Sequence, residues 1–257
     1  MATFLFDEII FGPVRSRRLG VSLGVNLLPT DAKICNFDCI YCECGWTMSA
    51  KSHKLPSRTE VKERMHSRLE QMKADGDTLD VITFAGNGEP TIHPDFSGII
   101  DDTINLRNKY FSKARIAVLS NSTMLHKPKV VEALKRVDQN ILKLDSGFDS
   151  TLQLLNQPKK PITARQVIDH LKQFNGNFTL QTLFIRGTFK GKPVDNATPL
   201  ELERWLEIVE ELKPKDVMVY TIARDTPVDT LKKVSQSELE SIAQRVRDLG
   251  IQAQVSG

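Results

Sequence analysis

The feature that most constrains the fold is a regular alternation of short β-rich runs with amphipathic helical patterns along almost the whole chain. Repeated βα units of this kind predict a parallel sheet with its helices packed on the outside. The strand-like runs cover residues 21–28, 80–85, 115–120, 140–145, 178–185, 216–222 and 251–255. The helical patterns between them cover residues 61–72, 96–111, 129–137, 150–155, 164–174, 199–212 and 237–249.

About six or seven βα units fall one or two short of a complete eightfold barrel. We therefore predict an α/β fold of the partial (β/α)6-type TIM barrel class with parallel strands, and a doubly wound open sheet is the alternative. The length of 257 residues suits a single domain over residues 1–257. In either architecture, the active residues are expected on loops that follow the carboxyl ends of strands.

Two of the helical patterns carry clear boundary signals. Ser57 with Glu60, and Ser235 with Glu238, each have the spacing of a capping box at a helix start. Gly250 follows the last helical pattern and suits the position just after a helix end. These signals predict where the first and last helices begin and where the last one ends.

The composition excludes several classes of protein. Lys and Arg number 35 against 32 Asp and Glu, and the net charge of +3 is too small to indicate a nucleic-acid partner by itself. The N-terminal lead-in, residues 1–20, begins with an apolar stretch that contains two acids, lacks a basic segment and is too short to span a bilayer. We expect a cytoplasmic protein without a membrane segment.

All the cysteines of the chain lie close together in a predicted loop over residues 31–56, at Cys35, Cys39, Cys42 and Cys44. A disulfide framework would spread its cysteines, so this clustering indicates metal or redox chemistry. The first three have the spacing C-x3-C-x2-C, which can place three thiolates on three irons of a cubane and leave the fourth iron open. Clusters that only carry electrons usually have four cysteine ligands, so three ligands indicate chemistry at the cluster.

The spacing, with aromatic Tyr41 directly before Cys42, resembles the signature of the radical S-adenosylmethionine (radical SAM) superfamily. The resemblance implies a [4Fe-4S] cluster on Cys35, Cys39 and Cys42, with S-adenosylmethionine bound at the open iron. It further implies an enzyme that cleaves S-adenosylmethionine reductively to a 5′-deoxyadenosyl radical, which takes hydrogen from a substrate. A flavodoxin or ferredoxin type of reductant is the implied partner.

Cys44 leaves alternatives open. It could be a fourth thiolate ligand, although two ligands spaced C-x-C would be crowded on adjacent irons. A free thiol or a neighbour with a modest structural or substrate-side role is the other interpretation. Zinc on all four cysteines is a further alternative, but zinc fingers usually have a second, distant pair of cysteines and this chain has none.

The segment Asn87-Gly88-Glu89-Pro90 follows the second predicted strand. Glycine lets the backbone approach a ligand closely there, and Glu89 can accept from an ammonium group. The segment resembles the Gly-Gly-Glu-Pro motif that binds the methionine amino group in the superfamily, with Asn87 in place of the first glycine. Because Asn tolerates positive φ, we expect the loop to keep its shape. A plain Asn-Gly turn is the alternative.

Polar side chains also follow the next two strands. Ser120 and Asn121 end the third strand, where the superfamily places contacts to ribose or to the methionine carboxylate, and an Asx turn is the alternative. Lys143 and Asp145 share a face at the end of the fourth strand, so they meet either a ligand or each other in a salt bridge. We expect Tyr41, Lys143 and Tyr220 to contact the cofactor.

The candidates for substrate contact are Asp145, Arg186 and Arg17, the two arginines because a guanidinium can bind a carboxylate or phosphate bidentately. Gln181 and Thr182 are further polar groups on the fifth strand. The arginine-rich and glycine-rich lead-in before the cysteines resembles that of a poorly characterised group of radical SAM proteins related to wybutosine tRNA-modifying enzymes.

We expect a small-molecule or nucleobase-like substrate. RNA (tRNA) base modification and activation of a glycyl-radical enzyme are alternatives with the same chemistry. A non-enzymatic iron–sulfur or zinc binding module is the alternative from a different class.

Overall fold

The computed structural model describes residues 4–16, 19–48 and 53–256. Within them, one curved sheet has eight strands in the order β1-β2-β3-β4-β5-β6-β9-β11. All neighbours from β2 onward are parallel, and only β1 is antiparallel to its partner β2. The strands are β1 Ile10–Ser16, β2 Gly20–Val25, β3 Val81–Phe84, β4 Arg115–Ser120, β5 Gln139–Lys143, β6 Thr179–Leu183, β9 Asp216–Tyr220 and β11 Gln252–Ser256. The predicted partial barrel is confirmed.

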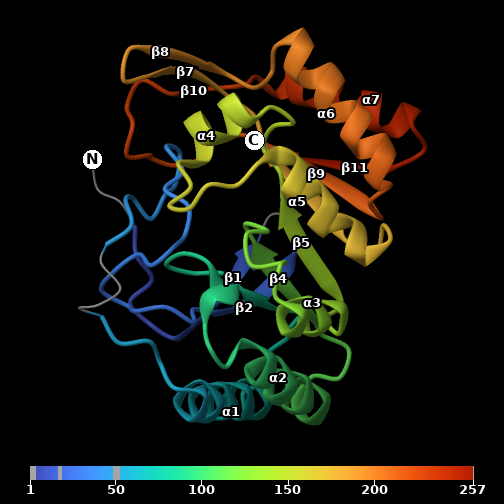
Figure 1. Cartoon of the computed structure of the whole chain (residues 1–257). Helices are drawn as coiled ribbons and strands as arrows, with labels where there is room; N and C mark the ends of the chain where they lie inside the picture. The colour runs from blue at the N-terminus through green and yellow to red at the C-terminus, as the bar shows by residue number, and fades with distance from the viewer. Residues whose placement is uncertain (1–3, 17–18, 49–52, 257) are drawn as a thin grey trace.

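Helices cover the outer face of this sheet. Figure 1 shows most of them along the lower and right-hand margins, with the loop segments 26–48 and 53–57, coloured blue, on the left. They are α1 Arg58–Ala74, α2 Phe96–Tyr110, α3 Pro128–Lys135, α4 Asp149–Asn156, α5 Ala164–Leu171, α6 Pro199–Leu212 and α7 Gln236–Asp248, with short 3-10 turns at Pro90–Ile92 and Lys172–Phe174. No helix in the described ranges is long and apolar enough to cross a membrane.

The expected start signals are present at both helices, but they differ in detail. At α7, Ser235 and Glu238 form a reciprocal capping box. At α1, the Ser57 hydroxyl accepts from the Glu60 N–H at 3.1 Å, but the Glu60 carboxylate accepts from Arg64 one turn later instead of reaching back. Only half of the predicted box therefore forms at α1.

Alternation along the strands divides the apolar side chains into two sets. The larger set packs between the sheet and the helices, and it includes Ile82, Ile116 and Val217. The neighbouring residues of the same strands face the barrel interior, where Val81, Ala117, Ile141 and Met218 form a small separate cluster with Leu19. The inner face is therefore apolar at the end of the barrel where the parallel strands begin.

Sequence patterns missed the strand β1 and a second sheet in the order β10-β7-β8, which comprises β7 Ile185–Phe189, β8 Lys192–Asp195 and β10 Lys232–Lys233. The predicted run 178–185 is in fact the end-to-end pair β6 and β7, which belong to different sheets. The pairing of β1 with β2 is interrupted between Phe11 and Val14, which breaks the period-two pattern that a strand prediction needs.

Trp205 is the largest side chain that is buried between α6 and the sheet. It is 1% exposed, its ring meets Phe184 edge-on at a centroid distance of 5.3 Å, and its Nε1–H donates to the Thr182 hydroxyl at 3.0 Å. Thr182 itself donates to the Leu144 carbonyl at 2.7 Å. Thr182 thus faces the outer helix layer and anchors α6.

We predict that Trp205→Ala lowers the free energy of unfolding by about 3–5 kcal/mol, because it leaves a large cavity and removes the hydrogen bond that the Thr182 hydroxyl oxygen accepts. Leu200→Ala on the same helix is the control, since Leu200 is 67% exposed, and a change within about 0.5 kcal/mol is expected there. Denaturant unfolding followed by circular dichroism measures both. Equal losses in the two variants would contradict this account of the core.

Candidate active site

The cysteine loop after β2 is held from two sides by backbone hydrogen bonds. On one side, the Ile34 N–H donates to the Asn87 carbonyl at 2.9 Å, and the Glu89 N–H donates to the Ile34 carbonyl at 3.3 Å. On the other side, the Ile40 N–H donates to the carbonyl of Leu155, in α4, at 3.0 Å. The loop therefore has a fixed position at the carboxyl end of β3.

The four cysteine thiols line one cavity of about 330 Å³, which we call the thiol cavity. Its wall also includes most of the polar residues that the sequence predicted for this end of the barrel. These are Tyr41, Gly88, Glu89, Ser120, Asn121, Lys143 and Tyr220. The carboxyl ends of successive strands thus bring these side chains together around the cysteines, as a barrel predicts.

Burial and hydrogen bonds shift the pKa values of the three predicted cysteine ligands. It raises the pKa of Cys35 to about 12, with help from the negative charge of Glu89, and it raises the pKa of Cys39 to about 11. A hydrogen bond from the Cys44 thiol lowers the pKa of Cys42 to about 6. The Cys35 sulfur accepts the Phe37 N–H at 3.5 Å, and amide donors close to these sulfurs suit them to be thiolates.

Lys33 is a cation that lies next to the cysteines and that sequence reasoning missed. It is 2% exposed, donates to the Gly45 carbonyl at 2.7 Å and lies 3.5 Å from the Asp38 carboxylate. Burial works against its charge, but the nearby Cys42, Cys35 and Cys39 thiols outweigh burial and raise its pKa. A lysine two residues before the first cysteine is the signal that could have identified it.

Cys44 lies beside the ligand set and has a partner of its own. Its thiol is 3.6 Å from the Gly86 carbonyl, and the hydrogen bond to Cys42, with burial, raises its pKa. Among the described residues, no three His, Cys, Asp or Glu side chains converge as ligands of a single metal ion. Tetrahedral zinc needs such convergence, whereas a multi-iron cluster spreads its thiolates over several irons.

Glu89 is a buried carboxylate whose two oxygens have different partners. Its Oε1 accepts from the Thr91 N–H at 3.1 Å, from the Thr91 hydroxyl, and from the Ser120 hydroxyl at 2.9 Å. Its Oε2 accepts only the Asn121 N–H, at 2.6 Å, among the described residues. Burial raises the pKa of Glu89 and these hydrogen bonds oppose the rise. The Oε2 atom keeps capacity for a cationic ligand in the cavity.

Ser120 and Asn121 thus form hydrogen bonds with other residues of the site. Besides its backbone contact, Asn121 uses its side-chain amide to donate two hydrogen bonds. One goes to the side-chain oxygen Oδ1 of Asn36 at 2.8 Å, and the other goes to the Cys35 sulfur at 3.5 Å. The end of β4 therefore orients both Glu89 and the cysteine loop.

Asn87 lies behind the cavity wall rather than in it. Its side chain accepts the Phe6 N–H at 2.8 Å and donates to the carbonyls of Phe6 and Pro29, both at 2.8 Å. Asn87 is not among the residues with positive φ, so its expected tolerance of that conformation is not what the loop uses. Gly88 does have a positive φ, of 133°, and lies against the Ile34 backbone.

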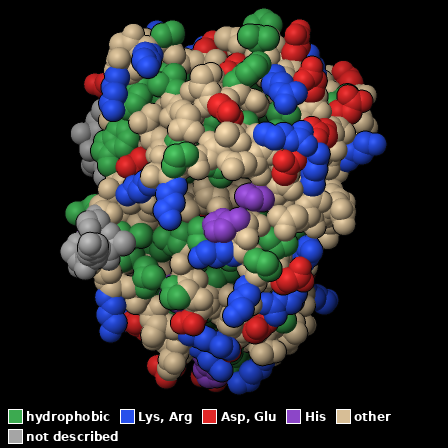
Figure 2. Space-filling view, in the orientation of Figure 1, with side chains coloured by type: hydrophobic (Ala, Val, Ile, Leu, Met, Phe, Trp, Pro, Cys, Tyr) green, Lys and Arg blue, Asp and Glu red, His purple; other side chains and the backbone are tan. Residues whose placement is uncertain are grey.

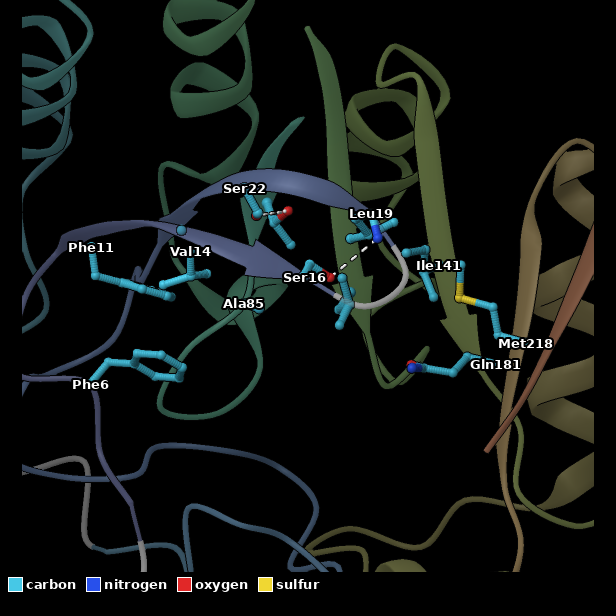
Figure 3. Close-up of a pocket in the computed structure, with 13 residues that line it drawn as sticks. Phe6, Phe11, Val14, Ser16, Leu19, Ser22, Ala85, Ile141, Gln181 and Met218 are labelled. Atoms are coloured by element: carbon cyan, nitrogen blue, oxygen red, sulfur yellow. Dashed lines mark hydrogen bonds between the residues drawn. The ribbon is translucent and has the colours of Figure 1, made fainter. Parts of the chain in front are cut away.

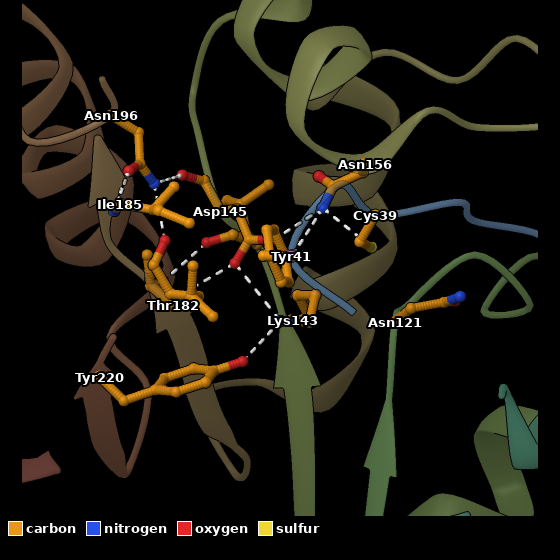
Figure 4. Close-up of polar contacts among 12 residues, drawn as sticks. Cys39, Tyr41, Asn121, Lys143, Asp145, Asn156, Thr182, Ile185, Asn196 and Tyr220 are labelled. Atoms are coloured by element: carbon orange, nitrogen blue, oxygen red, sulfur yellow. Dashed lines mark hydrogen bonds and ion pairs between the residues drawn. The ribbon is translucent and has the colours of Figure 1, made fainter. Parts of the chain in front are cut away.

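Asp145 is the centre of a buried polar network that joins the cysteine loop to β5 and β6 (Figure 4). Its Oδ2 accepts from the Tyr41 hydroxyl and from the Asn156 amide, the latter at 2.7 Å. Its Oδ1 accepts the Leu183 N–H at 3.0 Å and lies 3.4 Å from the Lys143 ammonium. With every oxygen occupied, Asp145 holds other groups in place and does not line the thiol cavity.

The partners of Asp145 extend the network toward the thiols. Asn156, which no sequence signal indicated, also donates to the Cys39 sulfur at 3.4 Å. Lys143 donates to the Tyr220 hydroxyl at 2.8 Å, and although burial opposes its charge, Asp145 raises its pKa. The salt bridge that the sequence offered as an alternative for Lys143 and Asp145 is therefore present, while Lys143 still lines the cavity.

Arg186, a second candidate for substrate contact, lies apart from this site. Arg186 lies in β7, where its guanidinium pairs with Asp195 at 3.0 Å and with Glu238 at 2.6 Å, and it does not line the thiol cavity. These pairs tie the small sheet to α7. Arg17 lies outside the described residues.

Comparison with known proteins agrees with this geometry. A family model described as the radical SAM superfamily matches residues 31–195, which is more than half of the chain. The chain belongs to the radical SAM superfamily. Members bind a [4Fe-4S] cluster and S-adenosylmethionine, so the chain is an enzyme of the radical SAM class.

The names of similar proteins do not identify a reaction for this chain. A UPF0026 protein of Helicobacter pylori (strain J99) is 30% identical over 235 residues, which are 90% of this chain and 71% of that protein. A protein of Brachyspira hyodysenteriae named GTPase Obg is also 30% identical over 235 residues, but the chain covers only 32% of its length. Most of that longer protein therefore lies outside the match.

Solved structures share the fold at low sequence identity. A radical SAM methyltransferase from Sphaerobacter thermophilus has a TM-score of 0.66 at 17% identity, over 91% of this chain and 65% of that one. Streptococcus suis SuiB bound to S-adenosylmethionine has a TM-score of 0.63 at 16% identity, over 90% of this chain and 50% of that one. These likenesses support the radical SAM fold.

We predict that Gly88→Ala prevents stable cluster loading. A Cβ at this position would lie 1.9 Å from the Ile34 carbonyl oxygen, so the cysteine loop must move away from β3. Gly191→Ala is the matched control, because Gly191 also has a positive φ, of 73°, but nothing lies within 4 Å of its Cβ position. Iron and sulfide per chain after anaerobic reconstitution provide the measurement. Retention of iron in Gly88→Ala would show that the contact does not position the loop.

We also predict that Asp145→Asn lowers the free energy of unfolding by about 3–5 kcal/mol, because an amide turns a donor toward other donors and leaves Lys143 without its counter-charge. Asp77→Asn, at an exposed carboxylate, is the control and should be near neutral. Denaturant unfolding of the cluster-free protein is the measurement, so that iron loading cannot affect the result. A stability equal to that of the wild type would contradict the role of the network.

Proposed function

We propose that the chain binds S-adenosylmethionine in the thiol cavity and acts on a small-molecule or nucleobase-like substrate. The observation that supports this proposal is the convergence of three thiols and the buried Glu89 carboxylate on one cavity. In a module that only stores a metal, the arrangement of Glu89 beside the thiols would have no purpose. A bound cluster would supply the electron that cleaves S-adenosylmethionine reductively to methionine and a 5′-deoxyadenosyl radical. This radical would abstract hydrogen from the substrate.

The residues of the chain have separate roles in this proposal. Cys35, Cys39 and Cys42 would hold the cluster by their three thiolates, and the cluster would bind the methionine moiety of S-adenosylmethionine in the same cavity. Glu89 accepts from the methionine ammonium through Oε2, and Ser120 and Asn121 keep the carboxylate in place by their hydrogen bonds to it. Lys33 places a positive charge near the thiolates, which offsets part of the negative charge of the ligand set.

The donor of the electron is proposed to be a small carrier of the flavodoxin or ferredoxin type, because reductive cleavage consumes one electron for each S-adenosylmethionine. Such carriers, and four reduced cysteines, suit a reducing compartment such as the cytoplasm.

A small substrate is favoured over RNA by the surface charge. Lys and Arg side chains are intermingled with Asp and Glu on the face shown in Figure 2, most visibly over α6 and α7, and the net charge is only +3. Phosphate-binding surfaces are usually strongly basic. RNA base modification, as in wybutosine-related proteins, and activation of a glycyl-radical enzyme remain the alternative substrates for the same chemistry.

The proposal predicts that anaerobically reconstituted protein, incubated with S-adenosylmethionine and dithionite, releases 5′-deoxyadenosine. The Cys35/Cys39/Cys42 triple alanine variant should release none, because no cluster can be held. Cys44→Ser should retain iron and activity, since a serine hydroxyl can still donate to the Gly86 carbonyl. Chromatography of the quenched mixtures measures the product.

Equal yields from the wild type and the triple variant would exclude chemistry at the cluster. Loss of iron in Cys44→Ser would instead make Cys44 a fourth ligand.

A further inference from the structure

A second cavity lies inside the barrel beside the thiol cavity, and we call it the inner chamber. Its volume is about 150 Å³. Phe6 and Phe11 stand on one side of it, and Ile141, Met218 and Gln181 stand on the other (Figure 3). The hairpin of β1 and β2 covers one end. Its described lining is Phe6, Phe11, Val14, Ser16, Leu19, Ser22, Gly24, Thr83, Ala85, Leu119, Ile141, Gln181 and Met218.

The inner chamber is mainly apolar, and its few polar groups differ in their hydrogen bonding. The hydroxyls of Ser22 and Thr83 hydrogen bond to each other at 2.8 Å, so they satisfy one another. The Gln181 side chain is different, because it faces the inner chamber and none of the described residues hydrogen bonds to its carboxamide, although the residue is only 5% exposed. The amide is therefore free to hydrogen bond to a molecule that occupies this space.

The inner chamber and the thiol cavity adjoin. Phe6, Ala85, Leu119 and Gln181 line both of them. Gln181 therefore lies at the boundary between the two cavities, between the cysteine end of the barrel and the apolar end. A group in the inner chamber would be next to the cofactor without displacing it.

We propose that the inner chamber binds the reacting end of the substrate, which is an uncharged apolar group about the size of one six-membered ring with a polar atom that hydrogen bonds to Gln181. This inference rests on the proposed function and adds the substrate class to it. A cavity of about 150 Å³ lined largely by aliphatic and aromatic side chains is large enough for benzene. A charged group would lose its hydration there without a counter-charge among the described lining residues.

Gln181 has the role of a specificity residue in this proposal. Its carboxamide offers both a donor and an acceptor, so it can pair with a carbonyl, a hydroxyl or an amide. Discrimination through such a group is strong, because a substrate that lacks the polar atom leaves the buried amide unpaired. In the ligand-free protein this amide faces the space of the two cavities, and in the proposal it pairs with the substrate when the substrate binds.

The test uses benzamide, a single ring with one carboxamide, added to reconstituted protein that has S-adenosylmethionine bound. Calorimetry and ligand-observed NMR should show saturable binding to the wild type. Gln181→Leu should weaken benzamide binding by about fivefold or more, through the loss of a hydrogen bond. Toluene, which needs no hydrogen bond, should bind Gln181→Leu at least as well as the wild type. Benzoate should bind the wild type more weakly than benzamide does.

Stability separates this role from a structural one. Without ligand, the thermal midpoint of Gln181→Leu should equal or exceed that of the wild type, because the substitution removes an unpartnered buried amide. Gln254→Leu, at an exposed position on β11, is the matched control and should leave benzamide binding unchanged. A lower midpoint for Gln181→Leu than for the control would mean that Gln181 supports the fold, and would overturn the proposal.

Three other results would also overturn the assignment of the inner chamber. They are a failure of benzamide to bind the wild type both with and without S-adenosylmethionine, equal benzamide binding by the wild type and Gln181→Leu, and binding of benzamide only when S-adenosylmethionine is absent. The last result would assign the inner chamber to the cofactor. Release of 5′-deoxyadenosine is measured on the same preparations. Its absence from the wild type would reject the proposed function, whereas its presence beside any of these three results would reject only the substrate class.

Discussion

The site depends on one close approach between two backbones, where the cysteine loop crosses the end of β3 at Gly88. A side chain at this position has no room, because the Ile34 carbonyl occupies the space where a Cβ would be. The same contact lets the N–H of Ile34 and the N–H of Glu89 find their acceptors. One glycine therefore fixes two walls of the thiol cavity relative to each other: the cysteines and the carboxylate.

The Asp145 network provides the second support, and it acts from the opposite side. It joins Tyr41 and Asn156, which contact or neighbour the cysteines, to the N–H of Leu183 and to Lys143. Because these groups are buried and bonded to each other, the loop has little freedom to adapt. The cysteines are presented by a rigid frame, which suits chemistry that requires the cofactor in one position.

The sequence predicted what depends on period and on motif spacing. The parallel strands, the outer helices and most of the predicted residues around the thiol cavity follow from local patterns and from the rule that strand ends meet at one edge, but Lys33 does not. It did not predict the functions of Asn87 or Asp145, since these depend on partners far away in the chain, Phe6 for one and Tyr41 for the other. Arg186 was misplaced in space for a related reason, because the strand after Leu183 leaves the barrel for the small sheet.

Asn87 has a consequence for how this site can vary during evolution. Its side chain satisfies both the N–H and the carbonyl of Phe6, a residue that lines both cavities. Replacement by glycine would leave those two groups of Phe6 without partners, while a different N-terminal segment would leave the buried Asn87 side chain with only the Pro29 carbonyl as a partner. The motif residue and the segment that precedes the barrel are therefore expected to change together, so that their covariation across homologous chains records a contact that neither motif shows alone.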